Sequence, residues 1–185
     1  MRFQSCLEAP FSLCGLLGRI EEGAFWRLPD DIIDTISPNI SLIARRSSGG
    51  RVRFRTNASE ISFRMRLKNL EPAQCMPLSG SAGADIFTGV GENSRFCGFI
   101  APENYEDRTA KTTIHTKGTL EQYTINLPRN EQLESFEIGI EEGALLLPAL
   151  PYRYETPDVL PPCIATYPER AHHTEKHAQQ GKSRQ

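Results

Sequence analysis

Few residues of this chain have the types and spacing that catalysis requires. A nucleophile elbow needs Gly-x-Ser-x-Gly between a strand and a helix. The nearest match, around Ser81, has Ser79 where the first glycine belongs and has loop-like sequence on both sides. His115 is flanked by threonines and a lysine, with no carboxylate nearby in the sequence, so it is interpreted as an ordinary strand histidine. The sequence therefore predicts no catalytic triad.

Asp85 has a more defined setting, because it follows Gly83-Ala84 where a loop enters a strand. A carboxylate at such a junction can accept backbone N–H bonds or pair with an arginine. Both roles are structural, and an aspartate after a glycine turn usually organises that turn. A small enzyme built on Asp85 and His115 is a weaker hypothesis, because thirty residues separate them and no third orienting group is evident.

The potential metal ligands do not form a site. The cysteines are odd in number and include no Cys-x-x-Cys pair, so neither a disulfide framework nor a zinc site is predicted. Three histidines lie in a polar C-terminal tail without a rigid spacing to other ligands. We expect no metal and no cofactor. The residues concerned are Cys6, Cys14, Cys75, Cys97, Cys163, His172, His173 and His177.

The elements that would position these residues are best seen in Ile40–Leu67, where two runs alternate apolar and charged residues with the period of a strand. Val52, Phe54 and Thr56 would face a core, opposite Arg51, Arg53 and Arg55; Ile61, Phe63, Met65 and Leu67 would oppose Ser62, Arg64 and Arg66. With turns at Ser47–Gly50 and Asn57–Ser59, the segment predicts a three-stranded meander with an arginine-rich outer face. Arg53 and Arg55 are therefore candidate ligand or interface residues.

Further short strands follow at a regular spacing up to residue 147, and no convincing helix is evident. About eight or nine short strands predict an all-β, antiparallel β-sandwich, with a jelly roll as the expected closure. We divide the chain into an ambiguous extension (1–22), the sandwich (23–154), and a Pro-rich and then polar tail (155–185) that is expected to be disordered.

Charge and hydropathy limit the partners. The net charge is −2, and the basic stretch Arg45–Lys68 and the acidic stretch Glu131–Asp158 could face each other. The arginine face itself carries no aromatic residues for base stacking, so no nucleic acid is expected. Neither a membrane span nor a convincing signal peptide is present, which predicts a soluble, cytoplasmic protein.

Trp26 lies in an apolar stretch ahead of a Pro-Asp-Asp turn. We expect it to close one end of the core. A second interpretation stays open, because aromatic residues on sandwich loops can bind sugars.

The order of these features resembles the N-terminal β-sandwich domain of one group of SGNH/GDSL-type hydrolases, a domain named for a Gly-x-Asp-Leu-Tyr motif. The resemblance covers about Gly23 to Tyr154, and Ile86 and Phe87 replace the motif's Leu and Tyr. The matching pieces are Phe25-Trp26-Arg27-Leu28-Pro29, Arg51-Val52-Arg53-Phe54-Arg55-Thr56 after a Ser-rich turn, Gly83-Ala84-Asp85-Ile86-Phe87, Tyr123-Thr124-Ile125-Asn126-Leu127-Pro128 and Leu133-Glu134-Ser135-Phe136-Glu137-Ile138-Gly139-Ile140.

In that family the sandwich is followed by a buried strand and a Gly-x-Ser turn, whereas Pro161–Pro168 occupies that place here. The resemblance thus implies an accessory domain of an esterase, inactive alone, that packs on a catalytic domain missing from this chain, and a truncated or frame-shifted gene would explain the ending. The implied substrates are esters, often of carbohydrates. The alternative is a stand-alone carbohydrate-binding module that uses Trp26, Tyr105 and Tyr152.

Overall fold

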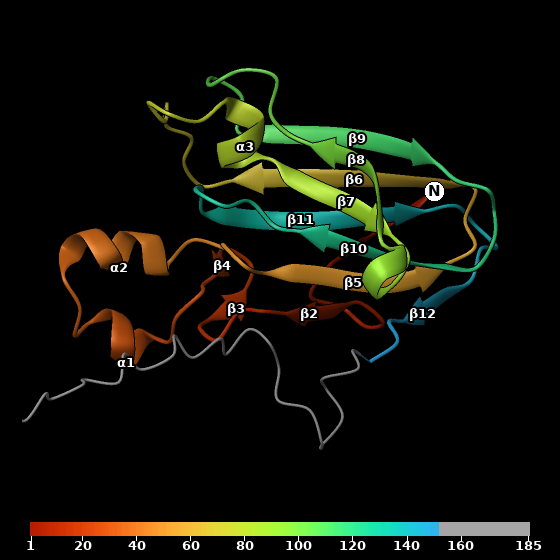
Figure 1. The fold of residues 1–185 in the computed structure, drawn as a ribbon, viewed down its shortest axis with the longest axis horizontal. Coiled ribbons are helices and arrows are strands. Elements are labelled where there is room, and N and C mark those ends of the chain that lie inside the picture. The colour runs from red at the N-terminus through yellow and green to blue at the C-terminus, as the bar shows by residue number, and fades with distance from the viewer. Residues whose placement is uncertain (152–185) are drawn as a thin grey trace, which may run out of the picture. The chain divides into compact units, whose positions relative to one another are not determined.

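The computed structural model describes residues 1–151, which form two antiparallel sheets and a small ribbon (Figure 1). Sheet A has the order β1 (Arg2–Ser5), β11 (Leu133–Ile140), β6 (Glu60–Leu67), β9 (Thr109–His115). Sheet B has the order β12 (Leu146–Pro148), β5 (Arg51–Thr56), β10 (Glu121–Asn126), β7 (Ala84–Thr88), β8 (Arg95–Ile100), and β2 (Ser12–Cys14) also pairs with β5. The ribbon pairs β3 (Ile20–Glu21) with β4 (Ala24–Phe25). The predicted antiparallel β-sandwich is confirmed.

The described residues contain 12 strands rather than eight or nine. Four of them, β1 to β4, are no longer than four residues and come from a segment in which no period-two pattern is long enough to recognise. Within the first 22 residues, which the sequence left unassigned, β1 pairs with β11 and Cys6 is 1% exposed in the core. The tail predicted for residues 155–185 lies outside the described residues.

Short helices also occur among residues 1–151: α1 (Asp30–Ile33), α2 (Pro38–Ala44), α3 (Leu78–Ala82) and the 3₁₀ turn η1 (Gly91–Asn93). The expected strand beginning at Ile40 is therefore wrong, because Ile40 lies inside α2. Pro38 stands at the start of this helix, where its fixed φ and missing N–H are tolerated. A short apolar run does not distinguish a helix from a buried strand.

The predicted meander is also wrong for its other two strands. β5 pairs with β10, β2 and β12 in sheet B, whereas β6 pairs with β11 and β9 in sheet A. The turn Asn57–Ser59 therefore carries the chain from one sheet to the other. Ala58 is fully buried in this corner, and its N–H donates to Thr56 Oγ1 at 3.1 Å.

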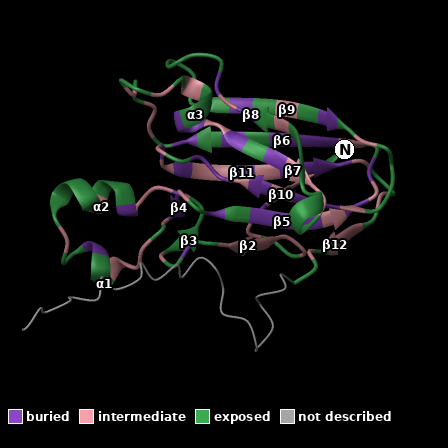
Figure 2. Cartoon of the chain, in the orientation of Figure 1, coloured by how far each residue is buried: buried purple, intermediate pink, exposed green. Residues whose placement is uncertain are grey.

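The core lies between the two sheets, and the predicted inward residues are confirmed there (Figure 2). Phe54 and Tyr123 stack across β5 and β10 with ring centroids 5.6 Å apart, and Phe63 contacts Phe136 across β6 and β11 at 6.3 Å. Burying one such side chain contributes about 1.5–3 kcal/mol. The first pair belongs to sheet B and the second to sheet A, and both belong to the core cluster.

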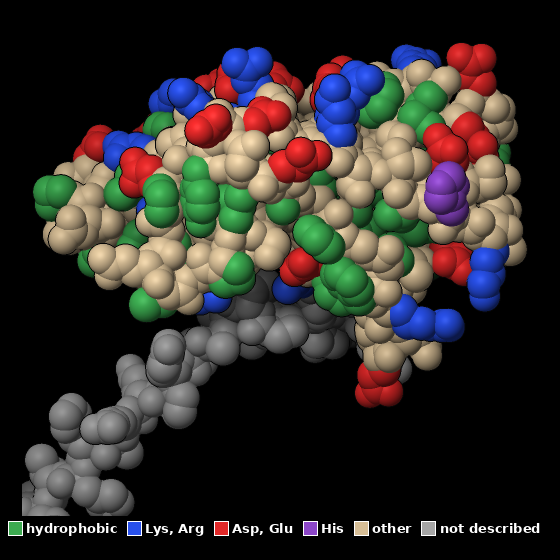
Figure 3. Space-filling model, turned by 90° about the horizontal axis from the view of Figure 1, so that it is seen from above, with side chains coloured by type: hydrophobic (Ala, Val, Ile, Leu, Met, Phe, Trp, Pro, Cys, Tyr) green, Lys and Arg blue, Asp and Glu red, His purple; other side chains and the backbone are tan. Residues whose placement is uncertain are grey.

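The outer face of sheet A matches the predicted pattern. Arg64 and Arg66 are exposed; the Arg64 guanidinium lies 3.5 Å from the Phe3 ring centroid, and Arg66 Nε pairs with Glu134 Oε2 at 2.9 Å. Part of the basic stretch therefore does face part of the acidic one. On the face turned to the viewer in Figure 3, acidic and basic side chains are mixed, with hydrophobic side chains between them.

No helix among the described residues is long and apolar enough to cross a membrane. The four cysteines within residues 1–151 are all free thiols.

Candidate functional site

Three of the four predicted site residues, Arg53, Arg55 and Asp85, lie on one surface, the outer face of sheet B. The strand register defines this surface, because residues directly opposite each other in paired strands point to the same side. One row runs Arg53, Thr124, Phe87, Phe96 across the four strands from β5 to β8. The next row runs Arg51, Asn126, Asp85, Phe99.

The β5 end of this face is covered by the chain that follows β12. Arg55 Nε donates to the Pro148 carbonyl at 2.9 Å, and Arg53 Nη2 donates to the Leu150 carbonyl at 2.6 Å. The Leu150 N–H in turn donates to Gln122 Oε1 on β10 at 2.8 Å. Arg53 is consequently only 2% exposed. The predicted cationic outer face is wrong at this position, because the guanidinium binds backbone carbonyls instead of facing solvent.

The segment Gly83–Phe87, which stands where the family motif was expected, shows why that pattern suits this strand. Ala84 and Ile86 are fully buried on the inner face, while Asp85 is exposed and Phe87 is half-buried on the outer face. A Cβ at Gly83 would lie 2.2 Å from the carbonyl oxygen of Ser79, the second residue of α3. Only glycine therefore allows β7 to begin so close to that helix.

Asp85 does not have the ion pair that the sequence suggested. Within residues 1–151 its carboxylate has no hydrogen bond or salt bridge. It lies between Asn126 on β10 and Phe99 on β8. Asp85 thus presents its carboxylate on the outer face of sheet B.

Beside Asp85 lies a group of aromatic side chains that the sequence reasoning missed. Phe96 is 58% exposed and Phe99 is 52% exposed, although both lie in β8. Phe96 contacts Phe87 edge-to-face, with centroids 5.7 Å apart at 74°. An irregularity in the β7–β8 register places Cys97 as an extra residue, and this brings Phe96 and Phe99 to the same side. If β8 alternated strictly, Cys97 rather than Phe96 would share the outer side with Phe99.

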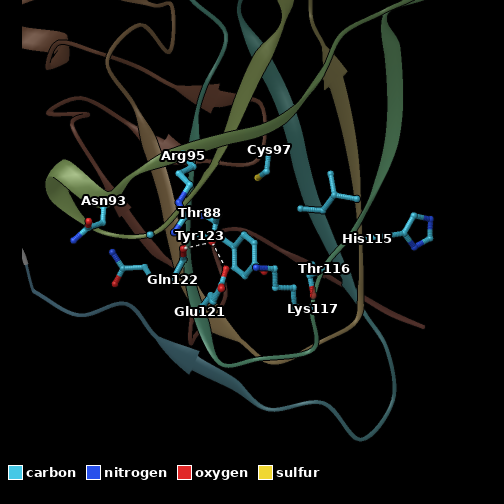
Figure 4. A pocket seen from close by; sticks show the side chains of 12 residues that line it. Thr88, Asn93, Arg95, Cys97, His115, Thr116, Lys117, Glu121, Gln122 and Tyr123 are labelled. Carbon is cyan, nitrogen blue, oxygen red and sulfur yellow. Dashed lines mark hydrogen bonds between the residues drawn. The ribbon is translucent and has the colours of Figure 1, made fainter.

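A pocket of about 350 Å³ opens at one end of the sandwich, between the β7–β8 end of sheet B and the β9–β10 connection, and Ile114 of sheet A and Tyr123 of sheet B are both in its lining (Figure 4). Thr88 Oγ1 donates to Glu121 Oε2 at 2.7 Å, and Cys97 Sγ donates to the Ile86 carbonyl at 3.3 Å. Burial raises the pKa of Cys97 to about 11, with a further contribution from the charge of Glu121. The thiol is therefore protonated at neutral pH, which disfavours it as a nucleophile.

The geometry does not support a small enzyme built on Asp85 and His115. Asp85 is on β7 of sheet B and His115 on β9 of sheet A; Figure 4 shows the His115 ring directed away from Glu121 and Thr88. Ser81 is fully buried, and its hydroxyl donates to the Leu78 carbonyl within α3. No group of three potential metal ligands occurs among residues 1–151. The described residues therefore bring together no catalytic constellation.

Trp26, the fourth predicted residue, lies away from this face, beside the β3–β4 ribbon. It is half-buried, and the guanidinium carbons of Arg19 and Arg45 lie 5.0 and 5.2 Å from its ring centroid. Such contacts stabilise by about 0.5–1 kcal/mol at exposed sites. Phe25, at 1% exposed, fills the core position that was expected of Trp26.

Residues 1–151 thus form an antiparallel β-sandwich in which β7 carries the motif-like sequence. The chain belongs to the GxDLY family, described as the N-terminus of SGNH-hydrolase-type esterases, whose family model matches residues 1–146. The family model matches from residue 1, whereas the sequence resemblance began at about Gly23. The family match therefore also includes β1 and β2.

Two solved structures have a similar fold. A GDSL-like lipase from Bacteroides ovatus ATCC 8483 superposes with a TM-score of 0.69 at 18% sequence identity, over 80% of this chain and 43% of the lipase. The salicylyl-acyltransferase SsfX3 from a tetracycline biosynthetic pathway gives a TM-score of 0.61 at 17% identity, over 82% of this chain and 42% of the transferase. The chain thus spans less than half the length of these proteins. No curated protein matches it.

Proposed function

We propose that this chain is the accessory N-terminal domain of an SGNH/GDSL-type esterase, and that it packs on a catalytic domain and helps to shape the entrance to its active site. The observation that carries the proposal is the family match over residues 1–146, combined with the absence of any catalytic constellation in residues 1–151. A family described as the N-terminus of esterases supports the proposal that the chemistry lies beyond the sandwich. This chain supplies a rigid scaffold rather than reacting groups.

The proposed substrate of the whole enzyme is an ester, and a carbohydrate ester is the finer proposal. Both structural neighbours are named for acyl chemistry, one as a lipase and the other as an acyltransferase. The carbohydrate part rests on the family resemblance alone. Within the accessory domain the sugar could contact the pocket near Glu121, where threonine, asparagine and glutamine side chains can hydrogen-bond hydroxyl groups.

The test has two parts. The purified chain, assayed with p-nitrophenyl acetate, should show no hydrolysis above a buffer blank, and turnover that a serine-directed phosphonate abolishes would overturn the proposal. In addition, the DNA that encodes the C-terminal end and continues beyond it should be read in all three frames. A buried strand followed by Gly-x-Ser, in frame or after a one-base shift, is the expected result.

A stand-alone carbohydrate-binding module is the second candidate, because Phe96, Phe99 and Tyr105 expose aromatic rings on the described surface. Trp26 fits this candidate less well, since two guanidinium groups already lie against its ring; Tyr152 lies outside the described residues. Calorimetric titration with common oligosaccharides separates the candidates. Saturable heat would favour the module, and flat titrations would favour the accessory domain.

A further inference from the structure

We infer that the β7–β8 part of the outer face of sheet B, formed by Asp85, Phe87, Phe96 and Phe99, is the docking face for the catalytic domain that follows this family's N-terminal sandwich. The inference rests on the proposed function and adds the surface through which it operates. Below, these four residues are called the docking face.

The first argument is the exposure of its aromatic rings. Single exposed apolar side chains are common on protein surfaces. Here two phenylalanines more than half exposed lie on one edge strand, and a third phenylalanine packs against one of them. An exposed apolar edge strand is prone to pair or aggregate unless something covers it. The composition of this strand therefore indicates a covered surface in the complete protein.

The second argument is where the chain leaves the domain. Leu150 is held on the same outer face, between Arg53 of β5 and Gln122 of β10. Strands lie about 4.8 Å apart, so β8 is only about 10–15 Å from this point. Any domain that follows residue 146 of the family match starts from this side of the molecule. A linker of about ten residues would span about 33 Å at most when fully extended. A domain joined by such a linker would therefore begin close to the docking face.

The third argument is the carboxylate of Asp85. It is exposed, has no ion pair within residues 1–151, and is bordered by Phe99 on the neighbouring strand. Burying a carboxylate under another domain costs free energy unless a hydrogen-bond donor or a positive charge pairs with it. The occupant should therefore bring an apolar patch with an arginine, a lysine or backbone N–H groups opposite Asp85.

A rival surface exists on α2, where Ile40, Leu42 and Ile43 are each about half exposed. Helix α2 contacts α1 (Figure 1), and within residues 1–151 it makes no hydrogen bond to the segment that follows β12. The docking face is favoured because it is continuous with the exit of the chain, and α2 supplies the matched control.

The experiment uses the full chain and, as a separate polypeptide, the catalytic part encoded beyond it in frame or after a one-base shift. Calorimetry should show binding, and F96S/F99S should weaken it at least tenfold while I40S/L42S leaves it unchanged. D85N should weaken it about threefold to tenfold. Circular dichroism melts check that each variant is folded, and both serine pairs replace exposed residues.

Hydrogen exchange on the wild-type proteins gives a readout that needs no variant. Amides in residues 84–100 should gain protection in the complex, and those in α2 should not. Wild-type binding that is insensitive to F96S/F99S, or protection confined to α2, would overturn the docking face and leave the proposed function standing. If no SGNH-type sequence continues the reading frame, or if the two polypeptides do not bind, the proposed function and the docking face fail together.

Discussion

Arg53 Nη2 lies 2.6 Å from the carbonyl oxygen of Leu150, which is ninety-seven residues further along the chain. The contact joins the third residue of β5 to the segment that leaves the domain. An arginine that alternation assigns to solvent is in fact a buried clamp on the C-terminal end of the sandwich. The last described part of the chain is therefore fixed to sheet B.

Replacing Arg53 with alanine should destabilise the domain, because the charged donor to the Leu150 carbonyl is removed. A hydrogen bond to a charged group contributes about 1.5–3 kcal/mol, and an equal loss in the free energy of unfolding is expected. Urea unfolding followed by tryptophan fluorescence measures it. R66A is the matched control, since its exposed pair with Glu134 contributes only about 0–1 kcal/mol. Equal losses in the two variants would contradict the clamp.

Replacing Gly83 with alanine should be strongly destabilising, by about 2–4 kcal/mol, because the new Cβ would lie 2.2 Å from the Ser79 carbonyl oxygen. Relief of this clash requires β7 or α3 to move. Thermal melts of G83A and G80A measure the effect. At Gly80 the Cβ would lie 3.2 Å from the flexible Met76 side chain, so G80A should change stability little. A G83A protein as stable as the wild type would show that this approach is looser than the structure indicates.

Alternation of apolar and polar residues identifies the side of a strand that faces the core. Ile61, Phe63 and Met65 are buried as predicted, because a period of two identifies the inward side of any half-buried strand. The pattern does not identify the sheet to which a strand belongs. β5 and β6 have the pattern of a hairpin, yet the buried Ala58 corner sends them to opposite sheets. Consecutive strands pair only about two-thirds of the time.

The candidate site was predictable to a similar degree. Arg53, Arg55 and Asp85 were chosen as site candidates from their types and positions; the structure places all three on the outer face of sheet B, and their role in a site stays a prediction. Phe96 and Phe99 were missed as a pair because the extra residue Cys97 breaks the alternation of β8. A bulge changes which residues share a face, and no periodicity reveals it.

The thiols should differ in reactivity although two of them are exposed. Burial raises the pKa of Cys97 to about 11 and that of Cys6 to about 12, with smaller contributions from Glu121 and Glu22 respectively. At pH 8 iodoacetamide should therefore modify the exposed Cys75 well before Cys97, and Cys6 last. Peptide mass spectrometry over a time course measures the order. A Cys97 that reacts as fast as Cys75 would contradict its partly buried setting in β8, where its thiol donates to the Ile86 carbonyl of β7.

Glu131 should make stability depend on pH in the opposite sense to that of an ordinary paired carboxylate. It is 3% exposed, and burial raises its pKa from an ordinary value of 4.5 to about 7, although a backbone N–H bond from Glu71 and the charge of Arg46 act to lower it. Between about pH 4.5 and 7 the folded state keeps the proton that the unfolded state has lost. The free energy of unfolding should therefore fall as pH rises through this window, by about 3 kcal/mol at most.

The variant E131Q tests this dependence, because a neutral amide of the same shape cannot ionise. Urea unfolding at pH 5 and pH 8 should show a wild-type protein that is less stable at pH 8, and an E131Q protein with a smaller difference between the two pH values. E134Q is the control, since the Glu134 side chain is 41% exposed and pairs with the exposed Arg66, and it should keep the wild-type difference. If E131Q lost stability between pH 5 and pH 8 as the wild type does, another group would have to carry the titration.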